Sequence, residues 1–197
     1  MSISGCQWGV MAWQGNTGER STRGLIRLGK YSRALDKLQR HKNEPWAQLY
    51  LGNLYLLEKG VSQDYSKALH WYLKASLQMK DDDWAWGDAY FGNRTGYYAQ
   101  NLYALKAQYL IGKMYNEGLG VKKDKIKAYL WVNYGLKLAK GKQFSKQSEE
   151  LLAEELKKSL SKEEMNLFLK KEKKWTPRSS QLFRLFNPTP NKIGRAN

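Results

Sequence analysis

The chain has 197 residues, of which 42% are hydrophobic and 26% charged, so it can bury a core and is not disordered throughout. Its 34 Lys and Arg against 18 Asp and Glu give a net charge of +16, which favours anionic partners. A single cysteine excludes an internal disulfide framework and a multi-cysteine zinc site. No apolar run approaches the roughly 18 residues that a membrane-spanning helix requires.

The first part of the chain reads as a leader. Glycine, asparagine, serine and threonine dominate residues 7–23, so we expect residues 1–24 to form a flexible leader. Residues 3–6 (Ile-Ser-Gly-Cys) resemble the lipobox of bacterial lipoproteins, in which the cysteine carries the lipid. No apolar segment precedes Cys6. Two interpretations therefore stay open: a free cysteine in a cytoplasmic protein, or the lipid attachment site of an envelope lipoprotein whose start lies upstream of Met1.

An internal repeat organises the middle of the chain. Residues 47–76 and 107–136 align without a gap at an offset of 60, and ten of the thirty aligned positions are identical. The identical positions are mostly small or aromatic residues. Such a match between two segments of one chain is typical of stacked repeat units rather than of a shared composition.

Each copy predicts an antiparallel pair of helices joined by a Gly-Val turn. In the first copy Gly52 lies on the apolar side of a helical pattern and permits two helices to approach closely. Gly60 then ends the first helix and Asp64 caps the second. The same residue types recur 60 positions later. One pair cannot bury its apolar side alone, so we expect the units to stack.

The repeated residues resemble the Sel-one-like repeat (SLR), a relative of the tetratricopeptide repeat. The shared pattern is Ala-x-x-x-x-Gly-x-x-Tyr, then Gly-x-Gly-Val-x-x-Asp, then Lys-Ala-x-x-Trp, and residues 107–131 carry nearly all of it. The first copy departs at Glu58, where the family has glycine, which predicts a slightly different turn; the second departs at Gly135, where alanine is usual. The resemblance implies an all-α, short superhelical array of antiparallel helix pairs, with about six or seven helices.

The flanks of the two copies fit the same architecture. Residues 28–35 resemble the second helix of a tetratricopeptide-type unit, so the repeat domain is expected to span residues 25–175. Residues 145–175 predict a C-terminal capping segment of two helices, with Ser161 opening a capping box. Residues 176–197 hold three prolines and no acid, and we expect a basic, extended tail.

An insertion separates the two copies. Units of the family are about 36 residues long, so an offset of 60 leaves about 24 residues to place within residues 77–106. The pattern from Gly96 onward predicts a lengthened first helix in the second unit. This insertion also combines four acids with aromatic side chains and one arginine; its candidate protein-binding residues are Trp84, Trp86, Tyr90, Phe91, Arg94, Tyr97 and Tyr98. They either fill the space beside longer helices or form a recognition patch, because Trp, Tyr and Arg anchor protein interfaces.

The residue inventory favours a protein without catalytic activity. His41 and His70 are the only histidines, and no metal-binding, nucleotide-binding or nucleophile motif occurs. We therefore expect no enzyme, no cofactor and no metal site. The positive charge is spread along the chain, with net charges of +5, +4, +3 and +4 in residues 1–45, 46–139, 140–175 and 176–197.

The resemblance implies a bacterial protein-interaction scaffold or adaptor. It binds a protein through the concave face of the array and the aromatic insertion, in a regulatory or effector-immunity role. The distributed charge favours a partner that is acidic or presents an acidic patch. Two alternatives stay open: an envelope lipoprotein contacting peptidoglycan or anionic lipid, and a basic factor associated with nucleic acid. The nucleic-acid alternative is less favoured, because a dedicated module concentrates its charge and interleaves arginine with aromatic residues.

Overall fold

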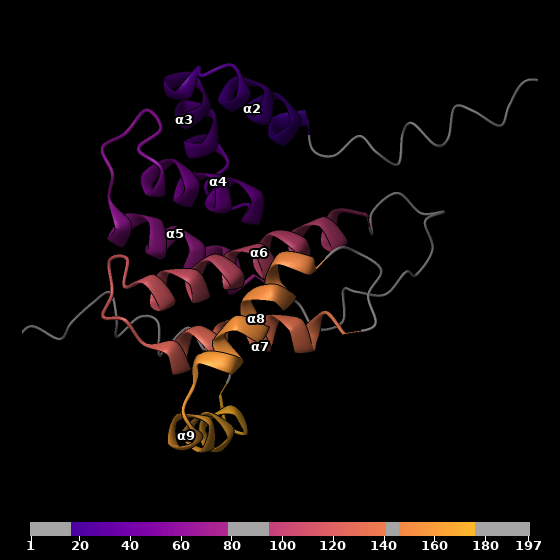
Figure 1. The fold of residues 1–197 in the computed structure, drawn as a ribbon. Helices are drawn as coiled ribbons and strands as arrows, with labels where there is room; N and C mark the ends of the chain where they lie inside the picture. The colour runs from indigo at the N-terminus through magenta and orange to yellow at the C-terminus, as the bar shows by residue number, and fades with distance from the viewer. Residues whose placement is uncertain (1–16, 79–94, 141–145, 176–197) are drawn as a thin grey trace, which may run out of the picture.

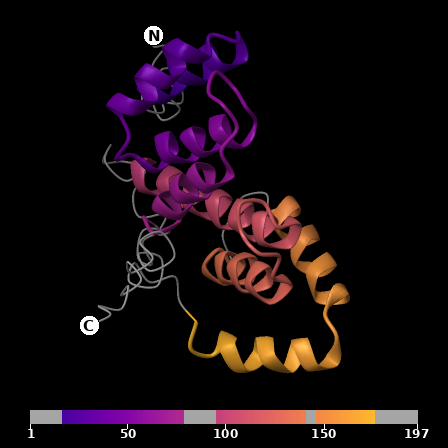
Figure 2. The same cartoon turned by 90° about the vertical axis from the view of Figure 1, so that its left-hand side faces the viewer.

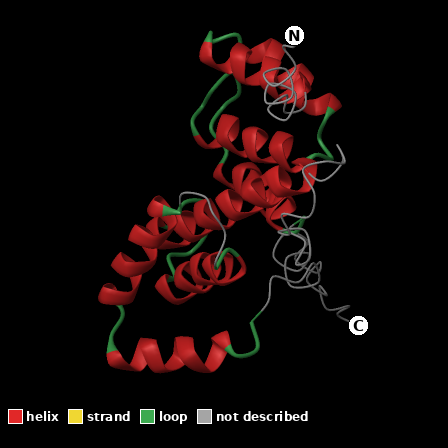
Figure 3. Cartoon of the chain, turned by 90° about the vertical axis from the view of Figure 1, so that its right-hand side faces the viewer, coloured by secondary structure: helices red, strands yellow, loops and turns green. Residues whose placement is uncertain are grey.

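The computed structural model describes residues 17–78, 95–140 and 146–175. These residues form helices and loops without a strand (Figures 1 and 3), which confirms the predicted all-α class. The described helices are one or two more than expected: α2 (Thr17–Arg27), α3 (Tyr31–Arg40), α4 (Pro45–Leu56), α5 (Tyr65–Ser76), α6 (Thr95–Glu117), α7 (Lys125–Leu138), α8 (Gln147–Ser159) and α9 (Lys162–Glu172). None of them is long and apolar enough to cross a membrane.

The helices stack as successive pairs along the array. The pairs α2–α3, α4–α5 and α6–α7 follow one another, and α8 and α9 pack against α7 at the far end (Figures 1 and 2). Two apolar clusters form the core: one joins α3 with α4, and the larger one extends from α4 to α9. Tyr103 of α6 packs against both clusters, so it lies where the N-terminal helices meet the second repeat.

The expectation of a leader reaching residue 24 is wrong for residues 17–24. They belong to α2, which supplies the missing first helix of the unit whose second helix is α3. Composition was misleading because Thr22 is fully buried and its hydroxyl donates to the carbonyl of Gly18 at 2.7 Å. Tertiary packing here overrides the weak helix propensity of glycine and threonine. Residues 1–16 and 176–197 lie outside the described residues.

The two repeats build the start of their second helix in the same way. In the first, Asp64 Oδ1 accepts a hydrogen bond from the backbone N–H of Lys67 at 2.9 Å, as predicted for an N-cap. The ammonium of Lys67 also lies 5.4 Å from the ring centroid of Tyr55. The equivalent residues of the second repeat show the same two distances: Tyr115, Asp124 and Lys127.

The turns before these caps also agree, which corrects the expectation at Glu58. Glu58 has φ 54° and the equivalent Gly118 has φ 79°, so both residues are left-handed. The first turn therefore keeps the geometry of the second although it carries a side chain. That conformation costs glutamate more than glycine, because its Cβ approaches the following carbonyl oxygen.

The glycines inside the first helices allow close packing, as predicted. A Cβ placed on Gly52 would lie 2.4 Å from Cε1 of Tyr72, and one placed on Gly112 would lie 2.4 Å from Cγ2 of Val132. Both distances are far inside van der Waals contact. The helices of each pair approach as closely as they do because neither position has a side chain.

The C-terminal helices close the array as expected. The Ser161 hydroxyl accepts from the backbone N–H of Glu164, whose carboxylate accepts in return from the backbone N–H of Ser161. The ring of Phe168 stacks on Tyr129 of α7 at 4.3 Å between centroids. Beyond α9, Trp175 returns to α7 and packs edge-on against Trp131 at 5.1 Å.

Candidate functional site

Most of the candidate residues of the insertion lie outside the described residues. They are Trp84, Trp86, Tyr90, Phe91 and Arg94, and the same holds for Cys6. Tyr97 and Tyr98 lie in the first turns of α6, where the lengthened helix was predicted, but their side chains are also outside the described part. The recognition patch and the lipid attachment site therefore stay predictions.

Arginine and lysine are segregated along the described residues. Every arginine of this part lies in α2 or α3, and every positively charged described residue after Lys42 is a lysine. Residues 17–44 carry 8 basic and 3 acidic side chains. The arginines are Arg20, Arg23, Arg27, Arg33 and Arg40. The first pair of helices thus differs from the rest of the array in the type of its positive charge.

Three of these arginines form a stripe along α2, which we call the α2 stripe: Arg20, Arg23 and Arg27. Their spacing of three and four residues places them on one side of the helix, and all three are exposed. Arg23 lies 3.8 Å from a carboxylate oxygen of Glu19. Arg20 and Arg27 form no ion pair with any described residue. Two guanidinium groups of the stripe are therefore exposed and have no carboxylate partner among the described residues.

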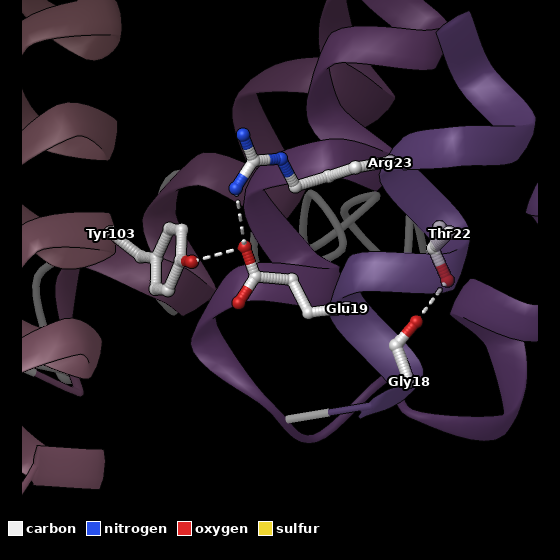
Figure 4. Close-up of polar contacts among 5 residues, drawn as sticks. All are labelled: Gly18, Glu19, Thr22, Arg23 and Tyr103. Carbon is white, nitrogen blue, oxygen red and sulfur yellow. Dashed lines mark hydrogen bonds and ion pairs between the residues drawn. The ribbon is translucent and has the colours of Figure 1, made fainter. Parts of the chain in front are cut away.

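Beside the α2 stripe lies a buried polar contact between α2 and α6 (Figure 4). The Tyr103 hydroxyl donates to Glu19, whose side chain also faces Arg23. Glu19 is only 8% exposed, so its carboxylate is enclosed by this contact. Burial, and then the hydrogen bond to Glu19, raise the pKa of Tyr103, so its phenol remains a donor. Glu19 thus fastens the first pair of helices to the second repeat.

Tyr50 of α4 borders the same contact. It is half-buried, and its ring packs edge-on against Trp46 at 6.4 Å between centroids. Burial raises the pKa of Tyr50, the Glu19 carboxylate raises it further, and Arg23 opposes both effects. These effects require Tyr50 to be close to both charges. The α2 stripe therefore adjoins a tyrosine from α4 and a tyrosine from α6.

The lysines farther along α6 are paired. The ammonium of Lys106 lies 3.5 Å from a carboxylate oxygen of Glu149 in α8 and 4.3 Å from the ring centroid of Tyr109. Lys113 lies 3.7 Å from a carboxylate oxygen of Glu117. Each of these lysines has a nearby carboxylate that offsets its charge. The unpaired positive charge beside the tyrosines is accordingly that of the α2 stripe.

A second basic region is an open depression of about 280 Å³ between α7 and α8. Lys137, Lys140 and Lys146 contribute to its lining. Lys137 lies 2.8 Å from a carboxylate oxygen of Glu172, and Lys146 donates to the carbonyl of Ala139 at 3.1 Å. Two of its three lysines thus already bind groups of the chain, and the depression offers less unpaired charge than the α2 stripe.

The described residues bring together no group of three or more metal-ligating side chains. His70 lies on α5 with its ring edge-on to Trp71 at 5.7 Å. Burial, and then Lys74, lower the pKa of His70, which keeps its imidazole neutral at pH 7. His41 lies 5.3 Å from the ring of Trp46. Both histidines therefore pack on aromatic rings.

The sequence of the two stacked pairs matches a known family model. The model of the Sel1 repeat matches residues 47–78 and 105–133, which are α4–α5 and most of α6–α7. The chain carries two Sel1 repeats. This confirms the resemblance to the SLR family that the identical positions indicated. No curated protein matches the sequence.

One solved structure supports the same fold. A protective antigen present in uropathogenic Escherichia coli strains, which displays an SLR fold, aligns with a TM-score of 0.59 and 19% identity over 96% of this chain and 37% of its own. A Sel1 repeat protein from Oxalobacter formigenes aligns with a TM-score of 0.24 and 20% identity over 65% of this chain and 64% of its own. This chain spans little more than a third of the E. coli antigen, so that likeness describes the fold alone.

Sel1 repeat proteins generally act as scaffolds for protein interactions, and their fold is typically non-catalytic. Sequence reasoning placed the two Sel1 repeats correctly but missed the α2 stripe. The stripe lies in a segment whose glycines and hydroxyl residues indicated a loop. The spacing of Arg20, Arg23 and Arg27 was the signal that could have revealed an amphipathic helix there.

Proposed function

We propose that this protein is a non-catalytic interaction scaffold that binds an acidic segment of a protein partner at the α2 stripe and the adjoining tyrosines of α4 and α6. The carrying observation is that Arg20 and Arg27 have no ion pair with any described residue, while the lysines of α6 have nearby carboxylates. A partner that supplies carboxylates at this position complements the unpaired charge.

Tyr50 and Tyr103 support this assignment, because tyrosine and arginine are enriched among the residues that dominate binding energy at interfaces. Exposed ion pairs contribute only about 0.2–1 kcal/mol each, so the arginines alone give a weak complex. Contact with the half-buried phenol rings adds apolar area. We therefore expect a reversible complex of moderate affinity, as suits the adaptor, regulatory or immunity-type roles that the resemblance implies in bacteria.

The insertion contributes to the same proposal. Trp84 and Trp86 precede α6 in sequence, and Tyr103 lies in the N-terminal half of that helix. We expect the insertion aromatics to extend the binding surface. The Trp84→Ala/Trp86→Ala variant should then bind the partner segment about tenfold more weakly. Binding equal to that of the unchanged chain would remove the insertion from the proposal and leave the α2 stripe in place.

Selection of displayed random peptides on the full chain tests the central claim. The selected peptides should be enriched in Asp and Glu, and their affinity, measured by fluorescence anisotropy, should fall more than about tenfold for Arg20→Glu/Arg27→Glu. The control is Arg33→Glu/Arg40→Glu, which changes the charge equally on the neighbouring helix and should lower affinity less than about threefold. Peptides without acidic residues, or equal losses in the two variants, would contradict the proposal.

A further inference from the structure

The α2 stripe consists of arginines, whereas the cations of the described helices after α3 are lysines, and two of its three arginines have no ion pair with a described residue. We infer that Arg20 and Arg27 recognise the carboxylates of the acidic segment by the fork geometry of the guanidinium group, so that lysine cannot replace them. This inference rests on the proposed function and names the feature of the surface that gives it specificity.

The distribution of cations within the described residues is the first argument. In the described helices after Lys42, lysine is the only positively charged residue type. The ion pairs of these helices are therefore formed by lysine ammonium groups. A lysine ammonium therefore suffices where the array needs only to balance a carboxylate of its own. Arginine differs because it presents five donors in a rigid plane that matches a carboxylate with two parallel hydrogen bonds.

The contact between Arg23 and Glu19 is the second argument. It shows that a carboxylate can lie directly beside the α2 stripe, with a guanidinium nitrogen 3.8 Å from a carboxylate oxygen. The side chain of Arg23 is still 63% exposed. Arg20 and Arg27 lie three residues before and four residues after Arg23, and no described carboxylate forms an ion pair with either of them. We expect a partner's Asp or Glu to provide a carboxylate that each of these two guanidinium groups can bind with two parallel hydrogen bonds.

The length of the stripe is the third argument, and it favours a short protein segment over nucleic acid. Seven residues of helix advance by about 10.5 Å, which is the span from Arg20 to Arg27. A nucleic-acid site needs a longer track of unpaired cations, because each neutralised phosphate contributes to affinity. Along α6 the track is interrupted, since Lys106 and Lys113 already have carboxylate partners. A segment with two or three carboxylates is long enough to pair with the arginines of the stripe.

Substitution of arginine by lysine tests the inference without changing the net charge. The variant is Arg20→Lys/Arg27→Lys, and the matched control is Arg33→Lys/Arg40→Lys on α3. Arginine and lysine have nearly equal helix propensity, so both variants should fold like the unchanged chain. The probes are a fluorescein-labelled acidic peptide obtained by the selection above and a labelled oligothymidylate of the same length, measured by anisotropy at physiological salt.

We expect Arg20→Lys/Arg27→Lys to bind the acidic peptide about tenfold more weakly, and the control variant to stay within about twofold of the unchanged chain. The oligothymidylate should bind all three proteins weakly and alike. Unchanged peptide affinity in Arg20→Lys/Arg27→Lys would overturn the inference. The proposed function would survive that result if Arg20→Glu/Arg27→Glu still lost binding.

Two further outcomes have separate meanings. If neither the lysine nor the glutamate variant of α2 changes peptide affinity, the α2 stripe is not the binding surface, and both the inference and the proposed function fail. If the oligothymidylate binds more tightly than the peptide and loses affinity on substitution of Arg20 and Arg27, the stripe recognises phosphates of nucleic acid. That result would also overturn the inference.

Discussion

The two Sel1 repeats share the geometry of their turns but differ in what surrounds equivalent side chains. Trp71 of the first repeat is half-buried, with the ammonium of Lys74 4.9 Å from its ring centroid. Trp131, the equivalent residue of the second repeat, is 4% exposed because Trp175 covers it. Equivalent positions of the two repeats thus share their backbone conformation, while the burial of the side chain depends on which elements pack beside that repeat.

The contacts between the paired helices also differ from one repeat to the other. Gly52 faces the flat ring of Tyr72, whose hydroxyl donates to Asn53 at 2.8 Å. Gly112 faces the branched side chain of Val132, with the carbonyl oxygen of Ala128 close behind it. Equivalent glycines therefore make room for different side chains in the two repeats. Substitutions at equivalent positions therefore show which stabilising contacts the two repeats have in common and which belong to one repeat.

The largest expected effect is at the glycines between paired helices. A Cβ at position 112 would also lie 3.0 Å from the backbone oxygen of Ala128, so Gly112→Ala forces the two helices apart. We expect it to lower the free energy of unfolding by about 3 kcal/mol, and Gly52→Ala by about 2 kcal/mol, in urea unfolding. Gly24→Ala in α2 is the control: no atom lies within 4 Å of its Cβ, and alanine there should stabilise slightly.

The second prediction concerns the packing of Trp175 against Trp131. Trp175→Ala removes edge-on contacts with Trp131 at 5.1 Å and Tyr134 at 5.6 Å. We expect it to lower the free energy of unfolding by about 2 kcal/mol and to speed hydrogen exchange in α9. Leu169→Ala, a change at a side chain that is 47% exposed, should cost less than about 0.5 kcal/mol. Equal effects of the two variants would show that Trp175 covers nothing essential.

The third prediction uses the shared caps. Asp64→Ala and Asp124→Ala should each lower Tm by roughly 2–4 °C in thermal unfolding, because each removes an equivalent hydrogen bond. Asn replacements, which keep a side-chain acceptor, should restore most of the loss. A large difference between the two alanine variants would show that the turns, although alike in geometry, differ in energy.

The cap of the first repeat also predicts a dependence on pH. The hydrogen bond from the backbone N–H of Lys67 lowers the pKa of Asp64. A lowered folded-state pKa stabilises the fold above the ordinary carboxyl pKa, near 4, and that contribution is lost as the pH falls through the lowered pKa. The Tm difference between the unchanged chain and Asp64→Ala should thus be constant from pH 7 to about pH 5 and shrink below about pH 4. A difference that grows in acid would contradict the assignment.

The smallest expected effect is at Glu58, the left-handed residue of the first turn. Glu58→Gly should raise the free energy of unfolding by about 0.5–1 kcal/mol, because glycine adopts a positive φ without the steric cost. Gly118→Glu should lower it by a similar amount in the second repeat. Both changes are read from the midpoints of urea unfolding at an unchanged slope. Effects of the same sign, or of very different size, for the two substitutions would show that the turns are not equivalent.

Local signals were sufficient for the repeat units. Asp64, Ser161 and Gly52 were assigned correctly, because a cap or a close helix contact depends on residue types within a few positions of the turn. The helix α2 was missed for the opposite reason. Its Glu19 binds Tyr103, which lies far away in sequence, so no window around residues 17–27 contained the contact that holds the helix in place.

The residues of the α2 stripe were not among the predicted site residues. The acidic partner stays a prediction, and net charge alone did not distinguish Arg20 and Arg27 from the many lysines of the chain. Whether a cation is available depends on which carboxylates the fold brings near it, as it brings Glu149 to Lys106. The aromatic residues of the insertion stay a prediction for the Trp84→Ala/Trp86→Ala variant to test.

By itself, then, the sequence determined that the chain is helical, where its two repeats lie, and how their turns are capped, since these features depend on residues a few positions apart. Only the tertiary structure decided that residues 17–27 form a helix of the array, that Trp175 buries one of two equivalent tryptophans, and that Arg20 and Arg27 have no ion pair among the described residues. Each of these depends on contacts between residues distant in sequence, whose partners the repeat pattern does not specify.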